Sequence, residues 1–581
     1  MIVLDQVIAN HSTLCNTALD NSFIEKNKYD CIVDRIPNMK LRRLSEDEFK
    51  NGIIKLLEFD PDKIQHEAYG KVLYIETETV KVPAVYHLLC EIILNIDAKV
   101  RAKSFLDIIE KYYKKVLSKY EITSDQFRAQ VRLFLPYAKL EKLHKLCNED
   151  NIDGSETIWE VEECILYPEL LREEVYSIVN SIYKSSHADL ISFDIKLAKD
   201  LPGNLGKYFR IEVTVKNTTE TRAHRLFAKM IDDNKEKLIA EFTKLPFRKE
   251  CFFFEILLDR LKELGLEKII DFCLKCYFTR RDMLIFDDSS VNGYSSWDYQ
   301  VPAPYSLLAT TIKLLAKLHA SSIIFEEKLS NKLGRTVRLD EEYPAYVREA
   351  AFVSKEEYRE VEQCNKRSIY GYLLSKFPAI PKRINIDNLR EKVKVAYDRI
   401  FDIVKKSENI RNVLSHGDLW GGNIMYKEDK TTEVCSAYLI DFQLIRYCPP
   451  SLDLMFLLYT NTDRVRRVKH LTELIRLYYK ELDHILGSYD IDLGNIFTFD
   501  ELMESCREVE PSIICISLMY GSFLLLPPQQ RKDIQNDKER CTKYFKVDNS
   551  PELEKAWDHE PFKIRTEGLI EDIIRIYDND A

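Results

Sequence analysis

The stretch that decides the fold is VLSHGDLWGGNIMY, residues 413–426, which places polar side chains on a loop between apolar segments. Asp418 is followed five residues later by Asn423, and Asp441 comes next in LIDFQ. Three oxygen-bearing side chains of this kind suit phosphoryl transfer, in which one aspartate accepts a hydroxyl proton while an asparagine and an aspartate hold Mg²⁺ on the phosphates of ATP. The pattern therefore predicts Asp418 as the catalytic residue and Asn423 and Asp441 as metal ligands.

Two nearby residues are expected to support this loop. His416 lies two residues before Asp418, where a histidine more often hydrogen-bonds the loop backbone than acts as an acid or base. Asp453, in PPSLDL, is likewise expected to brace the loop through hydrogen bonds and to make no contact with the substrate. We therefore predict both residues as structural support.

The N-terminal side of the chain offers the other parts that a kinase site requires, namely a turn over the phosphates, a lysine and its glutamate partner. Gly203 and Gly206 lie in LPGNLGKYFRIEVTV, Lys229 lies on an expected strand, and Glu250 starts an expected helix. A Gly-x-x-Gly is more often a plain turn, and a strand lysine is usually a solvated edge residue. Their order along the chain favours the kinase interpretation, in which Lys229 contacts the α and β phosphates and Glu250 holds it by an ion pair.

The motifs also resemble a known family. HGDLWGGNIMY and IDFQ resemble the catalytic and metal loops of the aminoglycoside phosphotransferase and choline kinase superfamily, and Trp420, Gln443 and PPSLDL resemble the ecdysteroid kinase-like family in particular. The resemblance covers roughly residues 158–581. It implies an enzyme that uses ATP and Mg²⁺ to phosphorylate a hydroxyl of an ecdysteroid or a related steroid or xenobiotic, a detoxification activity.

Two more segments fit the resemblance. DMLIFDDSSVNGY, residues 282–294, resembles the family's hinge, where backbone groups would meet adenine, and the resemblance adds Asp287 to the cofactor-binding residues. LLAKLHASS, residues 314–322, resembles a helix of the family that ends in LAxxHAxS. The glycine turn departs from the form usual in the family, in which Glu-Asn-Tyr follows the glycine. The positioning of phosphate by this turn is therefore the point where the resemblance is weakest.

One spacing bears on the substrate class. Protein kinases carry a long activation segment after the metal-binding aspartate, and this segment builds a platform for a peptide. Only eleven residues lie between Asp441 and Asp453, so an extended peptide substrate is not expected. A lining rich in carboxylates would indicate a cationic substrate such as choline or an aminoglycoside. Aromatic residues in the expected pocket favour a steroid instead, although aromatic residues on helices more often pack in a core; they are Tyr343, Tyr346, Phe352 and Trp420.

The chain also contains an internal similarity. The segment DAKVRAKSFLDIIEKYYKKVL, residues 97–117, aligns without gaps on DRVRRVKHLTELIRLYYKELD, residues 463–483, and Pro83 aligns with Pro449 in the same register. Two amphipathic helices can share an apolar face and a Tyr-Tyr pair by chance. Because the match continues beyond one helix, we favour a partial copy of the later unit.

Composition limits the other classes. The formal net charge is -10 and basic residues are interspersed with acidic ones, so nucleic acid is not an expected partner. The 14 cysteines have no repeating spacing, and the one close pair, Cys273 and Cys276, is expected to be two half-buried thiols. The start, MIVLDQVIANHS, lacks the features of a signal peptide, and the apolar run at residues 512–528 is too short to span a membrane. We expect a cytoplasmic protein that binds no membrane.

These observations predict an α+β, two-lobed, protein-kinase-like fold with a small β-rich N-lobe and a large helical C-lobe, preceded by a mostly helical partial copy of the C-lobe. His87 occupies the place of Asp453 in that copy, so we expect no catalysis from it. Two origins stay open for the copy: a part of the native protein, or a fusion with a tandem gene. An inactive nucleotide-binding pseudokinase is the alternative function, and the oligomeric state is not determined. The predicted limits are 1–147 for the copy, 148–157 for a linker, 158–290 for the N-lobe and 291–581 for the C-lobe.

Overall fold

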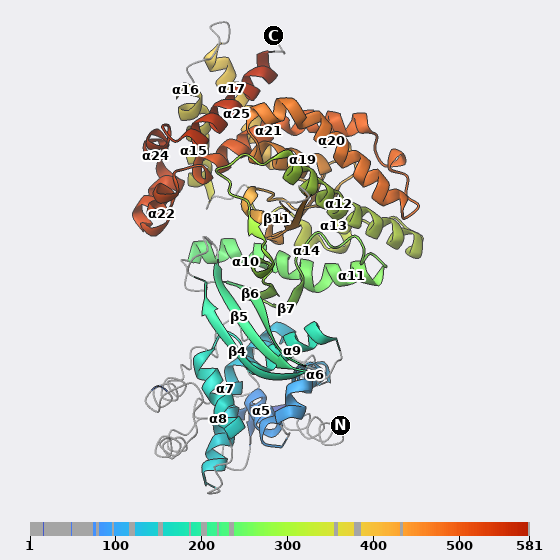
Figure 1. Cartoon of the computed structure of the whole chain (residues 1–581), viewed down its shortest axis with the longest axis vertical. Coiled ribbons are helices and arrows are strands. Elements are labelled where there is room, and N and C mark those ends of the chain that lie inside the picture. The colour runs from blue at the N-terminus through green and yellow to red at the C-terminus, as the bar shows by residue number, and fades with distance from the viewer. Residues whose placement is uncertain are drawn as a thin grey trace. The chain divides into compact units, whose positions relative to one another are not determined.

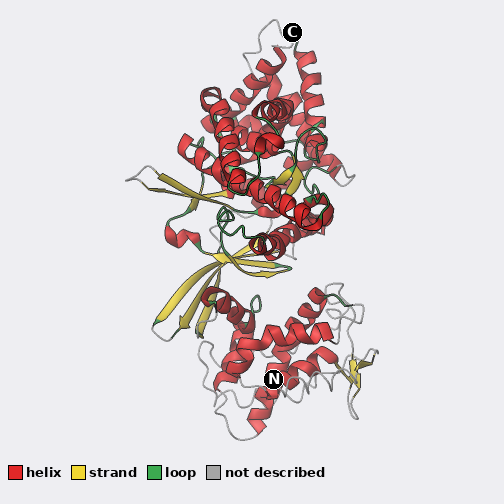
Figure 2. Ribbon diagram, turned by 90° about the vertical axis from the view of Figure 1, so that its right-hand side faces the viewer, coloured by secondary structure: helices red, strands yellow, loops and turns green. Residues whose placement is uncertain are grey.

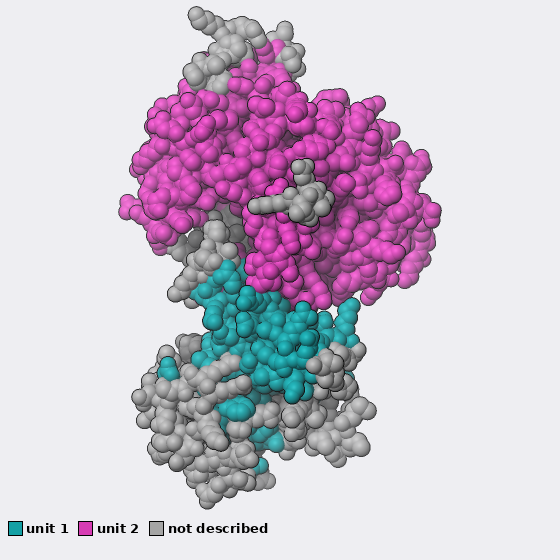
Figure 3. Space-filling model, in the orientation of Figure 1, with its two compact units in different colours: residues 1–199, 209–227 teal, residues 200–208, 228–581 magenta. Residues whose placement is uncertain are grey.

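The computed structural model describes residues 15–16, 48, 74–76, 81–95, 98–115, 122–148, 155–184, 188–198, 206–217, 220–231, 237–353, 358–376, 385–429 and 434–578. The chain divides into two compact units, coloured separately in Figure 3. Unit 1 comprises residues 1–199 and 209–227, and unit 2 comprises residues 200–208 and 228–581. The division therefore falls inside two strands, β5 (Gly206–Lys216) and β6 (Thr221–Ile231).

Unit 1 is built around a group of helices joined by buried ion pairs. Lys139, fully buried, lies 2.9 Å from a carboxylate oxygen of Glu173, and Arg132 pairs with Glu174 at 2.5 Å. These contacts connect one helix on each side of the predicted linker, and helical structure itself reaches Asn148 and resumes at Ser155. The helices are α5 (Ala84–Asn95), α6 (Ala98–Lys115), α7 (Ser124–Asn148), α8 (Ser155–Leu166) and α9 (Arg172–Tyr183).

The first three of these helices correspond in order to three helices in unit 2: α19 (Pro450–Asn461), α20 (Arg464–Gly487) and α21 (Phe499–Leu524). Helices α5 and α19 each have 12 residues, and each starts directly after the prolines that the alignment pairs, Pro83 and Pro449. Helix α5 packs against α7 just as α19 packs against α21.

Helices α7 and α21 also share their first turn. Thr123 and Gln126 exchange hydrogen bonds between side chain and backbone at the start of α7, and Thr498 and Glu501 do the same at the start of α21. Such reciprocal capping satisfies two backbone N–H groups that a helix start leaves unpaired. Each helix carries a proline at the same place from its start, Pro136 in one and Pro511 in the other.

The paired tyrosines give a further correspondence. Tyr113 donates a hydrogen bond to the carbonyl oxygen of Ile122 at 3.1 Å, and Tyr479 donates to that of Phe497 at 3.2 Å, in each case two residues before the next helix begins. The similarity thus includes matching helix starts and matching contacts, beyond a shared apolar pattern. The domain limits themselves stay a prediction, and most of residues 1–80 lie outside the described residues.

A five-stranded sheet in the order β4-β5-β6-β8-β7 forms the β-rich part. Strand β4 (Asp189–Leu197) is antiparallel to β5, and β7 (Cys276–Arg280) is antiparallel to β8 (Met283–Asp287). Phe209, Ile211, Val213 and Val215 alternate along β5 and are all buried, because successive side chains of a strand point to opposite faces.

The helical part of unit 2 surrounds α19, whose 12 residues are all buried. Helix α12 (Tyr305–Leu333) packs against α20, and α21 packs against α19 and against α25 (Glu560–Asp578). Figures 1 and 2 show these helices grouped around a few short strands. The other α-helices of this part are α10 (Lys237–Phe252), α11 (Leu258–Glu263), α13 (Leu339–Glu342), α14 (Pro344–Val347), α15 (Arg359–Lys366), α16 (Leu374–Lys376), α17 (Ile386–Asp398), α18 (Ile400–Ile403), α22 (Pro528–Asn536), α23 (Lys538–Thr542) and α24 (Ser550–Ala556).

Two sequence expectations are confirmed here. The apolar run that starts at Ser512 forms the buried second half of α21, and Cys273 and Cys276 are free thiols whose burial raises their pKa, to about 12 for Cys276. By length and composition α12 could cross a membrane, and α21 with α22 could do so as a bent pair, but 78% of the apolar window of α12 is buried inside the protein, as in a core helix. A sheet followed by helices confirms the α+β fold class.

Candidate active site

A two-stranded ladder brings the two catalytic loops together. Strand β10 (Val413–Ser415) pairs with β13 (Arg446–Cys448), so the loop that leaves β10 and the loop that enters β13 lie side by side. Between them the chain forms the hairpin of β11 (Ile424–Asp429) and β12 (Val434–Leu439), and β11 also pairs with β9 (Ser295–Ser296). Asp441 follows the hairpin with φ 67° and ψ 63°, the left-handed conformation that turns the chain there.

Asp418 is buried at 6% exposure, and hydrogen bonds hold both of its carboxylate oxygens. The side-chain nitrogen of Asn423 donates to Oδ2 at 2.9 Å, and the hydroxyl of Tyr520 donates to Oδ1 at 2.8 Å. Burial, aided by the negative charge of Asp441, raises the pKa of Asp418 to about 7, although the two hydrogen bonds act in the other direction. A carboxylate with this pKa is suited to accept a proton near neutral pH.

Lys229 joins the sheet to the metal loop. Its ammonium lies 2.6 Å from Oε2 of Glu250 and 2.6 Å from Oδ1 of Asp441. Although burial opposes its charge, the two carboxylates raise the pKa of Lys229 above its usual value, so the lysine stays protonated. Burial raises the pKa of Glu250 to about 7, against the effect of Lys229. The three residues that are predicted separately along the chain therefore meet at one point. Glu250 does not start a helix as predicted: α10 begins at Lys237 and continues through Pro246, so Glu250 lies near its end.

The residues predicted as metal ligands fit Mg²⁺ by the chemistry of their donors. Asn423 uses its side-chain nitrogen for hydrogen bonds to Asp418, which leaves its carbonyl oxygen as the atom that can face a cation. Asp441 is 23% exposed and offers carboxylate oxygens. Mg²⁺ prefers oxygen ligands and usually keeps water and phosphate oxygens beside one or two carboxylates. In the described part of the chain, no group of three or more His, Cys, Asp or Glu side chains could hold a metal.

The supporting residues have the contacts that support requires. Asp453 accepts the backbone N–H of His416 at 2.5 Å with Oδ2 and that of Gly417 at 2.9 Å with Oδ1. Although burial works against its charge, hydrogen bonding from His319 and other neighbours lowers the pKa of Asp453 to about 2. Burial lowers the pKa of His416, so its ring is neutral, and its Nε2 donates to the carbonyl oxygen of Ile440 at 3.0 Å.

Helix α12 supplies the next contacts. His319, fully buried, lies with Nε2 3.3 Å from Oδ2 of Asp453 and with Nδ1 2.7 Å from the hydroxyl of Tyr478. One turn along, Ser322 accepts the backbone N–H of Leu414 on β10 at 3.0 Å. The LLAKLHASS segment therefore contacts both the bracing aspartate and the strand that leads into the catalytic loop.

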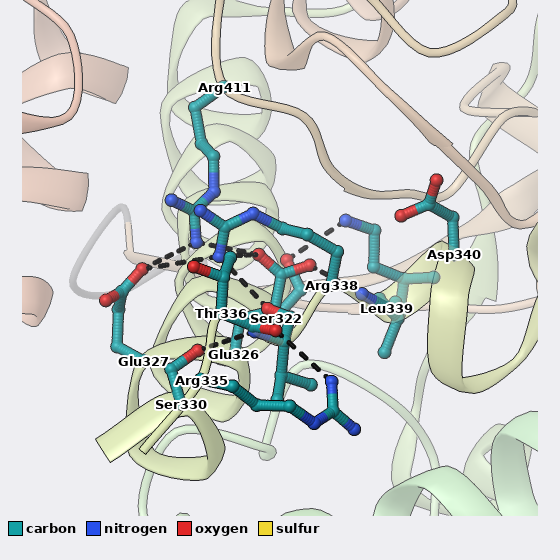
Figure 4. Close-up of polar contacts among 12 residues, drawn as sticks. Ser322, Glu326, Glu327, Ser330, Arg335, Thr336, Arg338, Leu339, Asp340 and Arg411 are labelled. Atoms are coloured by element: carbon teal, nitrogen blue, oxygen red, sulfur yellow. Dashed lines mark hydrogen bonds and ion pairs between the residues drawn. The ribbon is translucent and has the colours of Figure 1, made fainter. Parts of the chain in front are cut away.

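A cluster of charged side chains, shown in Figure 4, is centred on Glu326 and Glu327 of the same helix. Glu326 is fully buried; Arg411 contacts its Oε2 at 2.7 Å, and the backbone N–H of Leu339 donates to its Oε1 at 2.8 Å. Glu327 pairs with the same arginine at 2.7 Å, and Arg338 points toward both glutamates. Because Arg411 lies two residues before β10, this cluster fixes the entry to the strand.

Arg446 is a site residue that the sequence did not reveal. It is 2% exposed, donates to the carbonyl oxygen of Gly417 at 2.8 Å, and pairs with Glu349 at 2.6 Å. Gly417 has φ 81°, and a Cβ atom there would lie 2.2 Å from the carbonyl oxygen of Leu444. The catalytic loop is thus packed directly against the metal loop, at a distance that only glycine allows.

The structure says less about the other residues predicted to bind the nucleotide, Gly203, Gly206 and Asp287. Gly203 lies outside the described residues. Gly206 begins β5, and a Cβ atom there would lie 2.6 Å from the carbonyl oxygen of Met230, the residue after Lys229. Asp287 ends β8, where its backbone N–H donates to the carbonyl oxygen of Lys275 at 3.1 Å. The described contacts of Asp287 include no other predicted site residue.

The aromatic residues considered for the acceptor pocket separate into two groups. Tyr346 stacks on Phe252 of α10 with ring centroids 4.3 Å apart, and Tyr343 contacts the same ring at 4.9 Å, so both pack between helices. Trp420, half-buried and two residues after Asp418, meets the ring of Tyr299 edge-on at 5.8 Å. The ring centre of Phe352 lies 5.8 Å from the guanidinium carbon of Arg446, which contacts Gly417. Trp420 and Phe352 are thus the two of the four predicted aromatic residues that lie near the loop of Asp418.

A lysine held between a helix glutamate and the aspartate of LIDFQ, beside the buried Asp418, is the arrangement that the sequence predicts for a kinase-like site. Residues 204–490 match the family model described as the ecdysteroid kinase-like family. The resemblance to this family that the sequence predicts is therefore confirmed over residues 204–490.

Other similarities are more limited. A 4-hydroxytryptamine kinase of Psilocybe cyanescens is 38% identical over 58 residues, which span 10% of this chain and 16% of that protein. Among solved structures, an ethanolamine kinase of Plasmodium vivax is 13% identical, with a TM-score of 0.27, over 84% of this chain and 97% of the other. The streptomycin–ATP–APH(2″)-IIa ternary complex is also 13% identical, with a TM-score of 0.26, over 66% and 95% of the two chains.

Proposed function

We propose that this protein is an ATP- and Mg²⁺-dependent O-phosphotransferase that phosphorylates a hydroxyl of an ecdysteroid or of a related steroid or xenobiotic. The observation that carries the proposal is the geometry of the site: Asp418 is a buried carboxylate with both oxygens hydrogen-bonded, and it stands beside a Lys229–Glu250–Asp441 cluster. A base of this kind takes the proton of an acceptor hydroxyl as the phosphoryl group arrives.

The other residues bind and orient the nucleotide. Lys229, fixed by Glu250, holds the α and β phosphates, and the oxygens of Asn423 and Asp441 hold Mg²⁺. Bound Mg²⁺ neutralises the charge that develops on the phosphate oxygens. The direct contact between Lys229 and Asp441, at 2.6 Å, supports this assignment because it places the two residues in one cluster.

The connection after the metal loop supports a small acceptor. From Asp441 the chain makes one short turn, η8 (Phe442–Leu444), then enters β13 and reaches helix α19 at Pro450. All residues of this connection are described, and they form no platform on which an extended peptide could lie. The small-molecule acceptors of the family and of the 4-hydroxytryptamine kinase that shares 58 residues agree with this conclusion.

The surroundings of the base favour an apolar, flat acceptor over a cationic one. Trp420 stands half-buried beside Asp418, and the ring of Phe456 contacts the Tyr520 ring edge-on at 5.1 Å. Glu349 lies against the same loop, and its charge is paired with Arg446. Because the Trp420 ring alone would also suit a quaternary ammonium by cation–π contact, the paired charge of Glu349 is what favours the steroid class over a choline-like one.

The experiment is transfer of phosphate from ATP, followed by mass spectrometry, onto ecdysteroids, plant sterols, 4-hydroxytryptamine, choline and an aminoglycoside. The full chain is compared with Asp418→Asn and with a matched control, Asp387→Asn, whose carboxylate is 82% exposed. We expect one phosphate to be added to a steroid by the wild type and the control, and about 100- to 10,000-fold more slowly by Asp418→Asn. Binding of Mg·ATP without transfer to any acceptor would instead identify a nucleotide-binding pseudokinase.

A further inference from the structure

Tyr520 is a residue of the site that neither its sequence context nor the metal chemistry assigns. It lies near the end of α21, within the apolar run SIICISLMYGSFLLLPP, and its hydroxyl donates to Oδ1 of Asp418 at 2.8 Å across 102 residues of sequence. Asn423 donates to the other oxygen, Oδ2, at 2.9 Å. The plane of the Asp418 carboxylate is therefore fixed from two sides by groups on different elements.

The orientation of the Tyr520 ring is itself fixed. The ring of Phe456, on the buried helix α19, meets it at 77° with centroids 5.1 Å apart. Burial and the nearby Asp418 carboxylate raise the pKa of Tyr520 well above its usual value, so the phenol remains a neutral hydrogen-bond donor. The phenol therefore cannot act as the base, but it can orient the carboxylate of Asp418.

A carboxylate oxygen can accept two hydrogen bonds. With one position on each oxygen of Asp418 occupied by Tyr520 and Asn423, the remaining positions face a defined direction. Positioning of this kind matters for catalysis because the base must lie within hydrogen-bond reach of the proton that it takes.

We propose that Tyr520 is a positioning residue that holds the carboxylate of Asp418 toward the acceptor hydroxyl, an inference that rests on the proposed function. In the transfer, Asp418 takes the proton of the acceptor O–H. The acceptor oxygen bonds to the γ-phosphorus of ATP, the bond from that phosphorus to the β,γ-bridging oxygen breaks, and ADP leaves. Tyr520 keeps its proton throughout and donates its hydrogen bond to Asp418.

The partial copy in unit 1 supports this assignment. Counted from the start of each helix, the place of Tyr520 in α21 is taken in α7 by Lys145, an exposed residue. The proline and the capping turn that only shape the helix are kept in α7, as Pro136 and Thr123 show. The tyrosine is thus absent from the copy that also lacks HGDLWGGNIMY, as expected of a residue that serves the base.

The test is to measure the steady-state kinetics of Tyr520→Phe with the acceptor that the transfer experiment identifies. We expect kcat to fall about 10- to 100-fold, as for other residues that orient a reacting group, with the KM for Mg·ATP within about twofold of wild type. Phenylalanine keeps the ring against Phe456. The matched control is Tyr305→Phe, which removes a tyrosine–carboxylate hydrogen bond of the same 2.8 Å length, to Glu473, on the surface.

A double-mutant cycle separates positioning from a general structural effect. If Tyr520 acts through Asp418, then Tyr520→Phe has no further effect on kcat in the Asp418→Asn background. Wild-type kcat in Tyr520→Phe, or losses that add fully in the double variant, would overturn the inference while leaving the proposed function in place. If the wild-type protein transfers no phosphate at all, the proposed function fails and the inference fails with it.

Discussion

Replacement of Asp453 by asparagine tests the bracing of the catalytic loop. The two carboxylate oxygens of Asp453 accept the backbone N–H groups of His416 and Gly417, and Oδ2 also faces His319. Asparagine has one accepting oxygen, and its NH₂ group would face a buried N–H donor. Hydrogen bonds to a charged group contribute about 1.5–3 kcal/mol each, so we expect Asp453→Asn to lower the free energy of unfolding by about 3 kcal/mol.

The pKa of Asp453 gives a second value for the stabilisation that its charged form provides. A decrease from 3.8 to about 2 corresponds to about 2.5 kcal/mol of preference for the charged form in the folded protein. Because the folded-state pKa is the lower one, this stability is fully present above about pH 4 and is lost as the pH falls from about 4 to about 2. In Asp453→Asn that part of the pH dependence should disappear.

Urea unfolding at pH 7 and at pH 3 measures both effects, and hydrogen exchange of the peptide containing His416 and Gly417 reports the local change. Asp492→Asn is the matched control: Asp492 also accepts a backbone N–H, that of Gly494 at 2.9 Å, but on the surface, and we expect it to cost at most about 1 kcal/mol. An Asp453→Asn protein with wild-type unfolding and unchanged exchange at His416 and Gly417 would refute the bracing argument.

Three shorter predictions address the rest of the site. Lys229→Met should lower kcat by about 100-fold or more, because it removes a fixed positive charge from the phosphates; steady-state transfer assays measure it. Asp441→Asn should raise the Mg²⁺ concentration for half-maximal activity by about tenfold or more, which a Mg²⁺ titration at fixed ATP checks. Gly417→Ala should destabilise the protein far more than Gly334→Ala, although both glycines have positive φ. A Cβ atom at Gly417 would lie 2.2 Å from the carbonyl oxygen of Leu444, whereas a Cβ atom at Gly334 would have nothing within 4 Å. The melting temperatures of the two variants test this prediction.

The sequence predicts the residues whose chemistry a kinase site requires by type and order. Lys229, Glu250 and Asp441 can be named from the sequence because a strand lysine, a helix glutamate and a metal-loop aspartate occur in fixed succession, and the fold brings them together at 2.6 Å. Asp418 and Asn423 can be named because they are five residues apart on one loop, where local geometry settles their contact.

Residues that act across long separations in sequence cannot be predicted in this way. Tyr520 lies in a stretch whose apolar pattern indicates only a buried helix, and Arg446 is one of many arginines until its contact with Gly417 is seen. Tyr343 and Tyr346 are expected beside the acceptor from the sequence, but they pack on Phe252. Aromatic side chains give no local signal that separates helix packing from ligand contact, because both bury the same surface.

The direct path from Asp441 through β13 to α19 has a consequence for control of the enzyme. Protein kinases are commonly switched by a phosphate that orders their activation segment and completes the alignment of lysine, glutamate and aspartate. Here the connection contains no such segment, and Lys229 contacts both carboxylates directly. We therefore predict that phosphorylation of this connection plays no part in aligning the lysine, the glutamate and the aspartate.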